Sequence, residues 1–217
     1  MKTYIYLSKT KIEMLFGQVP RQRREKVSAE LGFNLGVLAG KIASQIPDIE
    51  LLSSRASIVS QVLTEEGLTG SLATDRPWVA ADLICQSIRL PQNPNVFVLC
   101  SKTGEGVTLL VGSAANVVSG VPAPNPFLGF SYRPYIAEAL KAALAEYESM
   151  QLVVSSSPPM TQALAGSDLG DIIYYASNLP RSEQMNVQLI ARRLFSGQSQ
   201  HCSKVHLLSP LYVALRE

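Results

Sequence analysis

Two short turns in this sequence carry the residue types that bind anions, namely hydroxyls, lysines, a glycine and an amide. Each turn follows a short apolar run and precedes a segment with helical character. A helix that begins at such a turn offers unpaired backbone N–H groups and partial positive charge, which favour a phosphate or a carboxylate. Both turns are therefore candidate sites for a small anionic ligand or a nucleotide. Their residues are Ser8, Lys9, Thr10 and Lys11 in the first turn, and Gly112, Ser113 and Asn116 in the second.

Helix capping explains the same residues without a ligand. Thr10 and Glu13 are three positions apart, which matches a capping box. Ser113 can likewise cap a short helix. The second turn lacks the Gly-Lys-Ser/Thr ending of a P-loop, and no Gly-x-Gly-x-x-Gly fingerprint is present. Both interpretations of the turns stay open at this level.

A catalytic or metal site has little support in the sequence. His201 and His206 are the two histidines, and with Cys202 they form only a fragment of a metal site. No Gly-x-Ser-x-Gly motif is present. We expect no metal and no cofactor. An enzyme would have to bring together residues that are distant in sequence, and the hypothesis predicts that at least two of a set of five converge in one cleft. That set is His201, His206, Asp168, Asp171 and Glu30.

Composition indicates a globular protein. Of the 217 residues 47% are hydrophobic and 17% are charged, and the net charge is +2. No apolar run is long enough to span a bilayer and no signal peptide is evident, so we expect a cytoplasmic protein with no membrane partner. We expect no nucleic-acid partner, because no aromatic residues interleave with the basic cluster at 21–26. We expect that cluster in a loop or at the start of a strand. Cys85 and Cys100 lie in apolar runs typical of a core.

Hydrophobic periodicity predicts the elements that would hold these residues. Strands are predicted at 4–7, 28–42, 82–90, 95–101 and 107–111, the last three as an antiparallel meander. Helices are predicted at 48–66, with Gly67 as its stop, at 135–150, within 160–178, and at 183–195. Residues 205–215 resemble a strand, but Pro210 predicts two short strands or a bulge at a sheet edge.

These elements predict an α+β fold with one domain spanning residues 1–217. A single sheet of about six mixed or antiparallel strands would be covered by four or five helices. The N-terminal strand is expected deep in this sheet, which it would share with the C-terminal strand.

Three segments together resemble an uncharacterised bacterial family of about this length. The first contains Tyr6, Ser8, Thr10, Lys11, Ile12, Met14 and Leu15; the middle one is the hairpin that runs into residues 112–120; the last contains Leu207, Leu208 and Ser209–Leu215. The resemblance implies a single-domain bacterial protein. Because the family has no established activity, it assigns no catalytic residue.

Three functional hypotheses follow from these observations. The first is a small-ligand binding or sensor domain, with an anion or nucleotide held at the two turns. The second is a hydrolase acting on a phosphate-containing small molecule. The third is a homo-oligomeric interaction protein that assembles through a sheet edge, with Pro210 and the glycine-rich segment at 28–42 as its support.

Overall fold

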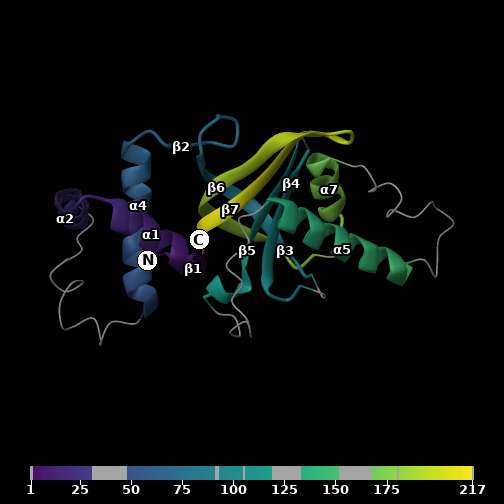
Figure 1. Ribbon diagram of the computed structural model, residues 1–217, viewed down its shortest axis with the longest axis horizontal. Helices are drawn as coiled ribbons and strands as arrows, with labels where there is room; N and C mark the ends of the chain where they lie inside the picture. Colours follow the sequence, from purple (N-terminus) through teal and green to yellow (C-terminus); the bar gives the residue numbers. More distant parts are fainter. Residues whose placement is uncertain are drawn as a thin grey trace.

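The computed structural model describes residues 2–30, 48–90, 93–104, 106–118, 133–151, 168–179 and 181–216. Five α-helices and seven strands lie within these ranges (Figure 1). The strands are β1 (Thr3–Leu7), β2 (Thr69–Gly70), β3 (Trp78–Ile88), β4 (Val96–Thr103), β5 (Gly106–Ser113), β6 (Met185–Ser199) and β7 (Cys202–Leu215). The helices are α1 (Lys9–Gln18), α2 (Arg21–Glu30), α4 (Asp48–Glu65), α5 (Arg133–Gln151) and α7 (Leu169–Ala176), with a short 3₁₀ turn η1 (Ala114–Asn116).

The predicted α+β class is confirmed, and the described strands form one mixed sheet of seven strands. Five of these strands close into a barrel, which corrects the expected layer covered by helices. Strands β3, β4 and β5 form the predicted antiparallel meander, and β5 pairs in parallel with β7. Strand β6 pairs antiparallel with both β7 and β3 and so closes the ring. The order β3-β4-β5-β7-β6 is the Greek-key connectivity of the OB-fold, although connectivity alone assigns no function. Strands β1 and β2 extend the ladder from β7 and β3.

Apolar residues fill the barrel and also cover its outside on two opposite sides. The inner core includes Leu99, Leu110, Val187 and Leu208. Outside, α5 and α7 pack over β4, β5 and β7, while α1 and α4 pack over the other side (Figure 1). The outer face of the second and third barrel strands, where OB-folds hold oligomeric ligands, is therefore covered by helices in this protein.

Strand β6 replaces the helix predicted at 183–195. Three apolar residues at helix-like spacing suggested that helix, but they belong to three different cores. Val187 faces the barrel interior, Ile190 packs under the N-terminal helices, and Leu194 packs under α5 and α7. Leu194 also sits in a bulge, because Arg193 pairs with Leu208 while Phe195 pairs with Leu207. A strand buried on both faces shows no polar alternation, so the pattern was misleading.

Pro210 lies in the interior of the sheet, which corrects the expected edge position. Strand β7 is continuous, with β6 along one side. On its other side it pairs with β5 up to Leu208 and with β1 from Tyr212. Pro210 stands between these two partners and beside a bulge, where its missing N–H is tolerated. Strand β1 is an edge strand of the sheet, contrary to the deep position expected for it. Its residues Tyr6 and Leu7 are nevertheless buried.

The segment from residue 21 to residue 42 also differs from expectation where it is described. The basic cluster lies on helix α2, and the start of the strand predicted at 28–42 belongs to the end of that helix. Residues 31–42 lie outside the described residues. The helices at 48–66 and 135–150 are confirmed, as is Gly67, whose φ of 65° allows the helix to end there.

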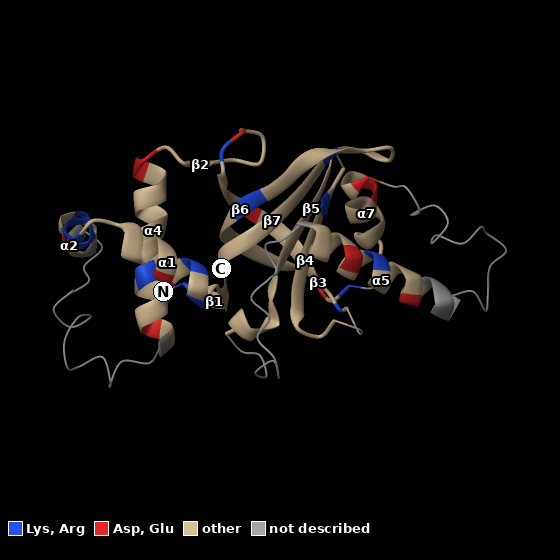
Figure 2. Ribbon diagram, viewed as in Figure 1, with Lys and Arg blue, Asp and Glu red and all other residues tan. Residues whose placement is uncertain are grey.

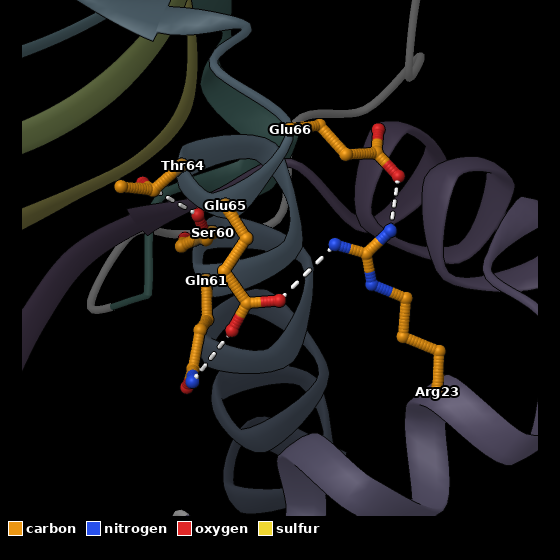
Figure 3. Close-up of polar contacts among 6 residues, drawn as sticks. All are labelled: Arg23, Ser60, Gln61, Thr64, Glu65 and Glu66. Carbon is orange, nitrogen blue, oxygen red and sulfur yellow. Dashed lines mark hydrogen bonds and ion pairs between the residues drawn. The ribbon is translucent and has the colours of Figure 1, made fainter.

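Helix α2 is held to α4 by ion pairs. Arg23 reaches Glu65 at 3.1 Å and Glu66 at 2.6 Å, and Gln61 supports Glu65 from the preceding turn (Figure 3). Figure 2 shows the lysines and arginines of α2 gathered at this end of the molecule. Arg21 pairs with Glu25 in the same helix. Part of the basic cluster is thus used within the chain.

Candidate functional site

A cavity of about 740 Å³ opens at one end of the barrel, where β3 separates from β4. Strand β3 pairs with β6 from Trp78 to Cys85 and with β4 only from Gln86 onward. Leu83 of β3 and Ser101 of β4 therefore line the cavity without pairing with each other. We call this cavity the barrel mouth. At the opposite end, Tyr6 is buried and stacks on Phe97, with 4.9 Å between the ring centroids. Its ring fills the space over Gly112.

The floor of the barrel mouth is a row of polar residues across four strands. Ser101 pairs with Thr108, Thr108 with His206, and His206 with Ser196. Two residues further into the barrel, the corresponding positions on β4, β5 and β7 are leucines of the inner core, Leu99, Leu110 and Leu208. Since side chains two apart on a strand face the same way, the inward row changes from leucine to polar at this end. Ser101, Thr108 and His206 are buried.

His206 and Ser196 form a hydrogen-bonded pair in this row. The distance from Ser196 Oγ to His206 Nδ1 is 3.0 Å. Burial lowers the pKa of His206 below its ordinary value, and the positive charges of Arg193 and Lys204 lower that pKa further. The imidazole is therefore neutral near pH 7 and can accept the serine hydroxyl proton in its Nε2–H tautomer.

Arg193 fixes the rim of the barrel mouth. Its guanidinium donates to the carbonyl oxygens of four residues in the loop 71–76, at 2.6 to 3.3 Å. Its backbone N–H donates to Pro77 O at 2.8 Å. The loop contributes Thr74 and Asp75 to the cavity lining. The arginine therefore holds the loop as a fixed wall.

The two turns singled out in the sequence lie side by side, and their polar groups bond within the protein. Lys9 N donates to Asn116 Oδ1 at 3.4 Å, and the Asn116 amide donates to Tyr6 OH at 3.3 Å. Ser113 caps η1 by accepting from Ala115 N, as the capping interpretation predicted. The capping box of Thr10 and Glu13 does not form. Helix α1 starts at Lys9 with Ser8 at its N-cap and no side-chain cap bond.

Lys11 of the first turn is directed into the protein. Its Nζ donates to Ser209 Oγ at 2.5 Å and to Pro210 O at 3.0 Å. Desolvation lowers the pKa of Lys11 to about 8, and the nearby positive charge of Arg192 contributes to that shift. The lysine thus satisfies the carbonyl beside the bulge in β7, where the ladder is interrupted.

The free energy of unfolding is expected to rise between pH 8 and pH 10 because of Lys11. Its pKa in the folded protein lies below the ordinary lysine value, so in this window the unfolded chain binds a proton that the folded chain does not. The rise is at most about 3 kcal/mol, and Lys11→Met should remove it. Urea unfolding at pH 7.5, 9 and 10 measures the effect, with exposed Lys9→Met as the control. A Lys11→Met protein that keeps the wild-type pH dependence would contradict this assignment.

The residues named for the enzyme hypothesis occupy different places. Of these, His206 lines the barrel mouth. Asp168 caps α7 by accepting from Asp171 N, and Asp171 accepts from Gln200 N at 2.9 Å, which docks α7 against the β6–β7 hairpin. His201 bonds Tyr175 OH at 2.9 Å and stacks on the neighbouring Tyr174. Glu30 ends α2, and its side chain is outside the described residues.

A second hollow of about 690 Å³ lies between α4 and the outer wall of β3 and β6. Its α4 lining includes Ser57, Ser60 and Thr64, whose hydroxyls donate to carbonyls of their own helix. The barrel mouth differs because its polar side chains continue the inward-facing rows of core leucines and lie at the end of a closed barrel. We therefore take the barrel mouth as the candidate site.

The sequence matches the family described as "Family of unknown function (DUF7019)" over residues 2–217. The chain belongs to this family. The DUF7019 match covers the barrel, the helices on both sides of it and the barrel mouth, and it confirms the resemblance to a family without an assigned activity. No curated protein and no solved structure matches the chain. Among the described residues, no helix of this DUF7019 chain has the length and apolar character needed to cross a membrane.

Sequence reasoning missed Ser101, Thr108, Ser196 and Arg193 as site residues. His206 was considered as part of a metal fragment and as one of the five residues of the enzyme hypothesis. One signal could have found them. On each of three neighbouring strands, a polar residue stands two positions from a core leucine, and the register of the strands places these polar residues in one row. That signal is invisible until β5 and β7 are known to be parallel neighbours, because their residues are nearly a hundred positions apart in the sequence.

Proposed function

We propose that this protein binds a small anionic molecule in the barrel mouth. The observation that carries the proposal is the polar row of Ser101, Thr108, His206 and Ser196, which interrupts an otherwise apolar barrel interior. Ligand sites are commonly concave spaces of several hundred Å³ with a few convergent polar groups. The barrel mouth has this size and this kind of lining.

The charges around the cavity favour an anion. Among the described residues that line it, Arg193 and Lys204 are the cations and Asp75 is the carboxylate, so these residues carry a net charge of +1 (+2 − 1) when His206 is neutral. Burial is the main cause of the lowered pKa of His206, and the positive charges of Arg193 and Lys204 lower that pKa further. Lys204 lies two residues from His206 on β7 and lines the same cavity, and it is the cation that we assign to the ligand. The hydroxyls of the floor would supply neutral hydrogen bonds.

Binding of a probe anion should raise the pKa of His206, because a nearby negative charge favours the imidazolium form. The probes are inorganic phosphate, citrate and AMP, and the readout is the NMR titration of the His206 ring. Lys204→Ala should weaken binding about tenfold or more, as expected for one charged hydrogen bond.

The control for this experiment is Lys102→Ala. Lys102 lies on the same end of β4, but its ammonium contacts Asn178 and the ring of Tyr174 on the outer side. Its removal changes the overall charge equally and should leave probe affinity within about twofold, since long-range surface charges are screened. Lys9→Ala tests the turn as the competing site. Binding that is lost in Lys9→Ala and kept in Lys204→Ala would overturn the assignment to the barrel mouth.

A further inference from the structure

The Ser196–His206 pair has the parts of a nucleophile and its general base. A serine hydroxyl is a weak nucleophile unless a base within hydrogen-bond distance takes its proton. Here the base candidate is at 3.0 Å, and both side chains line the same cavity. The histidine is almost fully buried, with 8% of its surface exposed, whereas Ser196 is exposed to the cavity.

The surroundings of the pair also suit acyl chemistry. The cations Arg193 on β6 and Lys204 on β7 face His206, and Asp75 of the rim loop lines the same space. Positive charge fixed near a reacting carbonyl stabilises the oxyanion that forms during attack. The residue after the nucleophile is Gly197, which has no side chain to obstruct a substrate and which also lines the cavity.

We propose that Ser196 is a nucleophile that cleaves a small carboxylic ester bearing a negative charge, with His206 as its general base. The inference rests on the proposed function, because it places the charged part of the ester in the anion site at Lys204. It names the substrate class and adds a reaction to that binding site.

The steps balance with water as the second substrate. Ser196 Oγ bonds to the ester carbonyl carbon while its proton passes to His206 Nδ1. The bond from carbon to the alcohol oxygen then breaks, and the alcohol leaves with that proton. Next, His206 takes a proton from water, whose oxygen attacks the acyl carbon. The bond to Ser196 Oγ breaks, the serine regains a proton from His206, and a carboxylic acid is released.

A fluorophosphonate probe tests the nucleophile on the intact protein. The probe phosphorus bonds to an activated serine oxygen with loss of fluoride, so intact-mass and peptide mass spectrometry identify the site. We expect one adduct, on Ser196, with a labelling rate that rises with pH and has its midpoint below the ordinary histidine pKa. Ser196→Ala should abolish the adduct. His206→Asn keeps an acceptor for the hydroxyl but no base, and it should slow labelling at least about 100-fold.

Ser203→Ala is the matched control, since Ser203 lines the same cavity and should not be labelled. Circular dichroism melts confirm that each variant is folded. The inference is overturned if the folded wild type remains unlabelled, or if labelling persists in Ser196→Ala or at an unchanged rate in His206→Asn. Unlabelled protein that still binds phosphate, citrate or AMP refutes the nucleophile and leaves the proposed function standing. A folded protein that is not labelled and binds none of these anions refutes both the nucleophile and the proposed anion site.

Discussion

Arg193→Met is expected to lower the free energy of unfolding by about 2–4 kcal/mol. The guanidinium donates to carbonyl oxygens of Ser71, Leu72, Thr74 and Arg76, and methionine can replace none of these bonds. The loop would lose its attachment to β6. Thermal unfolding should occur about 5–15 °C lower for a chain of this length.

The neighbouring Arg192→Met is the control for this prediction. Arg192 is exposed, and its substitution removes the same charge from the same strand. The free energy of unfolding should therefore change by no more than about 0.5 kcal/mol. The Arg193 variant should also bind the probe anions less tightly, because the loop that forms one wall of the barrel mouth is no longer fixed. Equal stability losses in the two variants would mean that charge, rather than the carbonyl clamp, is responsible.

Gly170→Ala is expected to destabilise the protein by about 2–3 kcal/mol, although alanine is the better helix former. A Cβ at Gly170 would lie only 2.2 Å from Gln198 O, which is backbone. That backbone belongs to the β6–β7 hairpin, which is paired on both sides of Gln198 and cannot move away cheaply. The substitution would therefore push α7 off the hairpin.

Gly17→Ala gives the opposite expectation and serves as the comparison. Gly17 lies in α1, and a Cβ there would meet no atom within 4 Å. The helix should gain about 0.5–1 kcal/mol from the substitution. Chemical denaturation of the two variants in parallel separates helix propensity from close packing. Similar changes in the free energy of unfolding of the two variants would show that the close contact with Gln198 does not determine the effect at Gly170.

Local signals in the sequence were sufficient for much of the fold. The helix at 48–66 ends at a glycine with positive φ, and β3, β4 and β5 follow one another closely in the sequence, so both features depend on neighbouring residues. Barrel closure depends on the pairing of β5 with β7, which no local pattern records. Strand β6 was misread because Val187, Ile190 and Leu194 face three different environments.

The candidate site was less accessible to sequence reasoning than the fold. Ser8–Lys11 and Gly112–Asn116 drew attention because their residue types suit anions, and the structure does bring the two turns together. There Asn116 accepts from Lys9 N, Ser113 caps η1, and the Lys11 ammonium bonds to β7. The barrel mouth depends on cross-strand register, so the same serine and threonine types were indistinguishable from surface residues in the sequence.

The pairing of β1 with the far end of β7 has a consequence for how the chain folds as it is synthesised. Thr3 pairs with Leu215, so β1 must wait until nearly the whole described chain has been synthesised before its partner strand exists. Until then the apolar side chains of Tyr6 and Leu7 lack their native cover. Such late, long-range closure slows folding and leaves a strand open to wrong partners. We expect refolding to be limited by this step and to be sensitive to protein concentration.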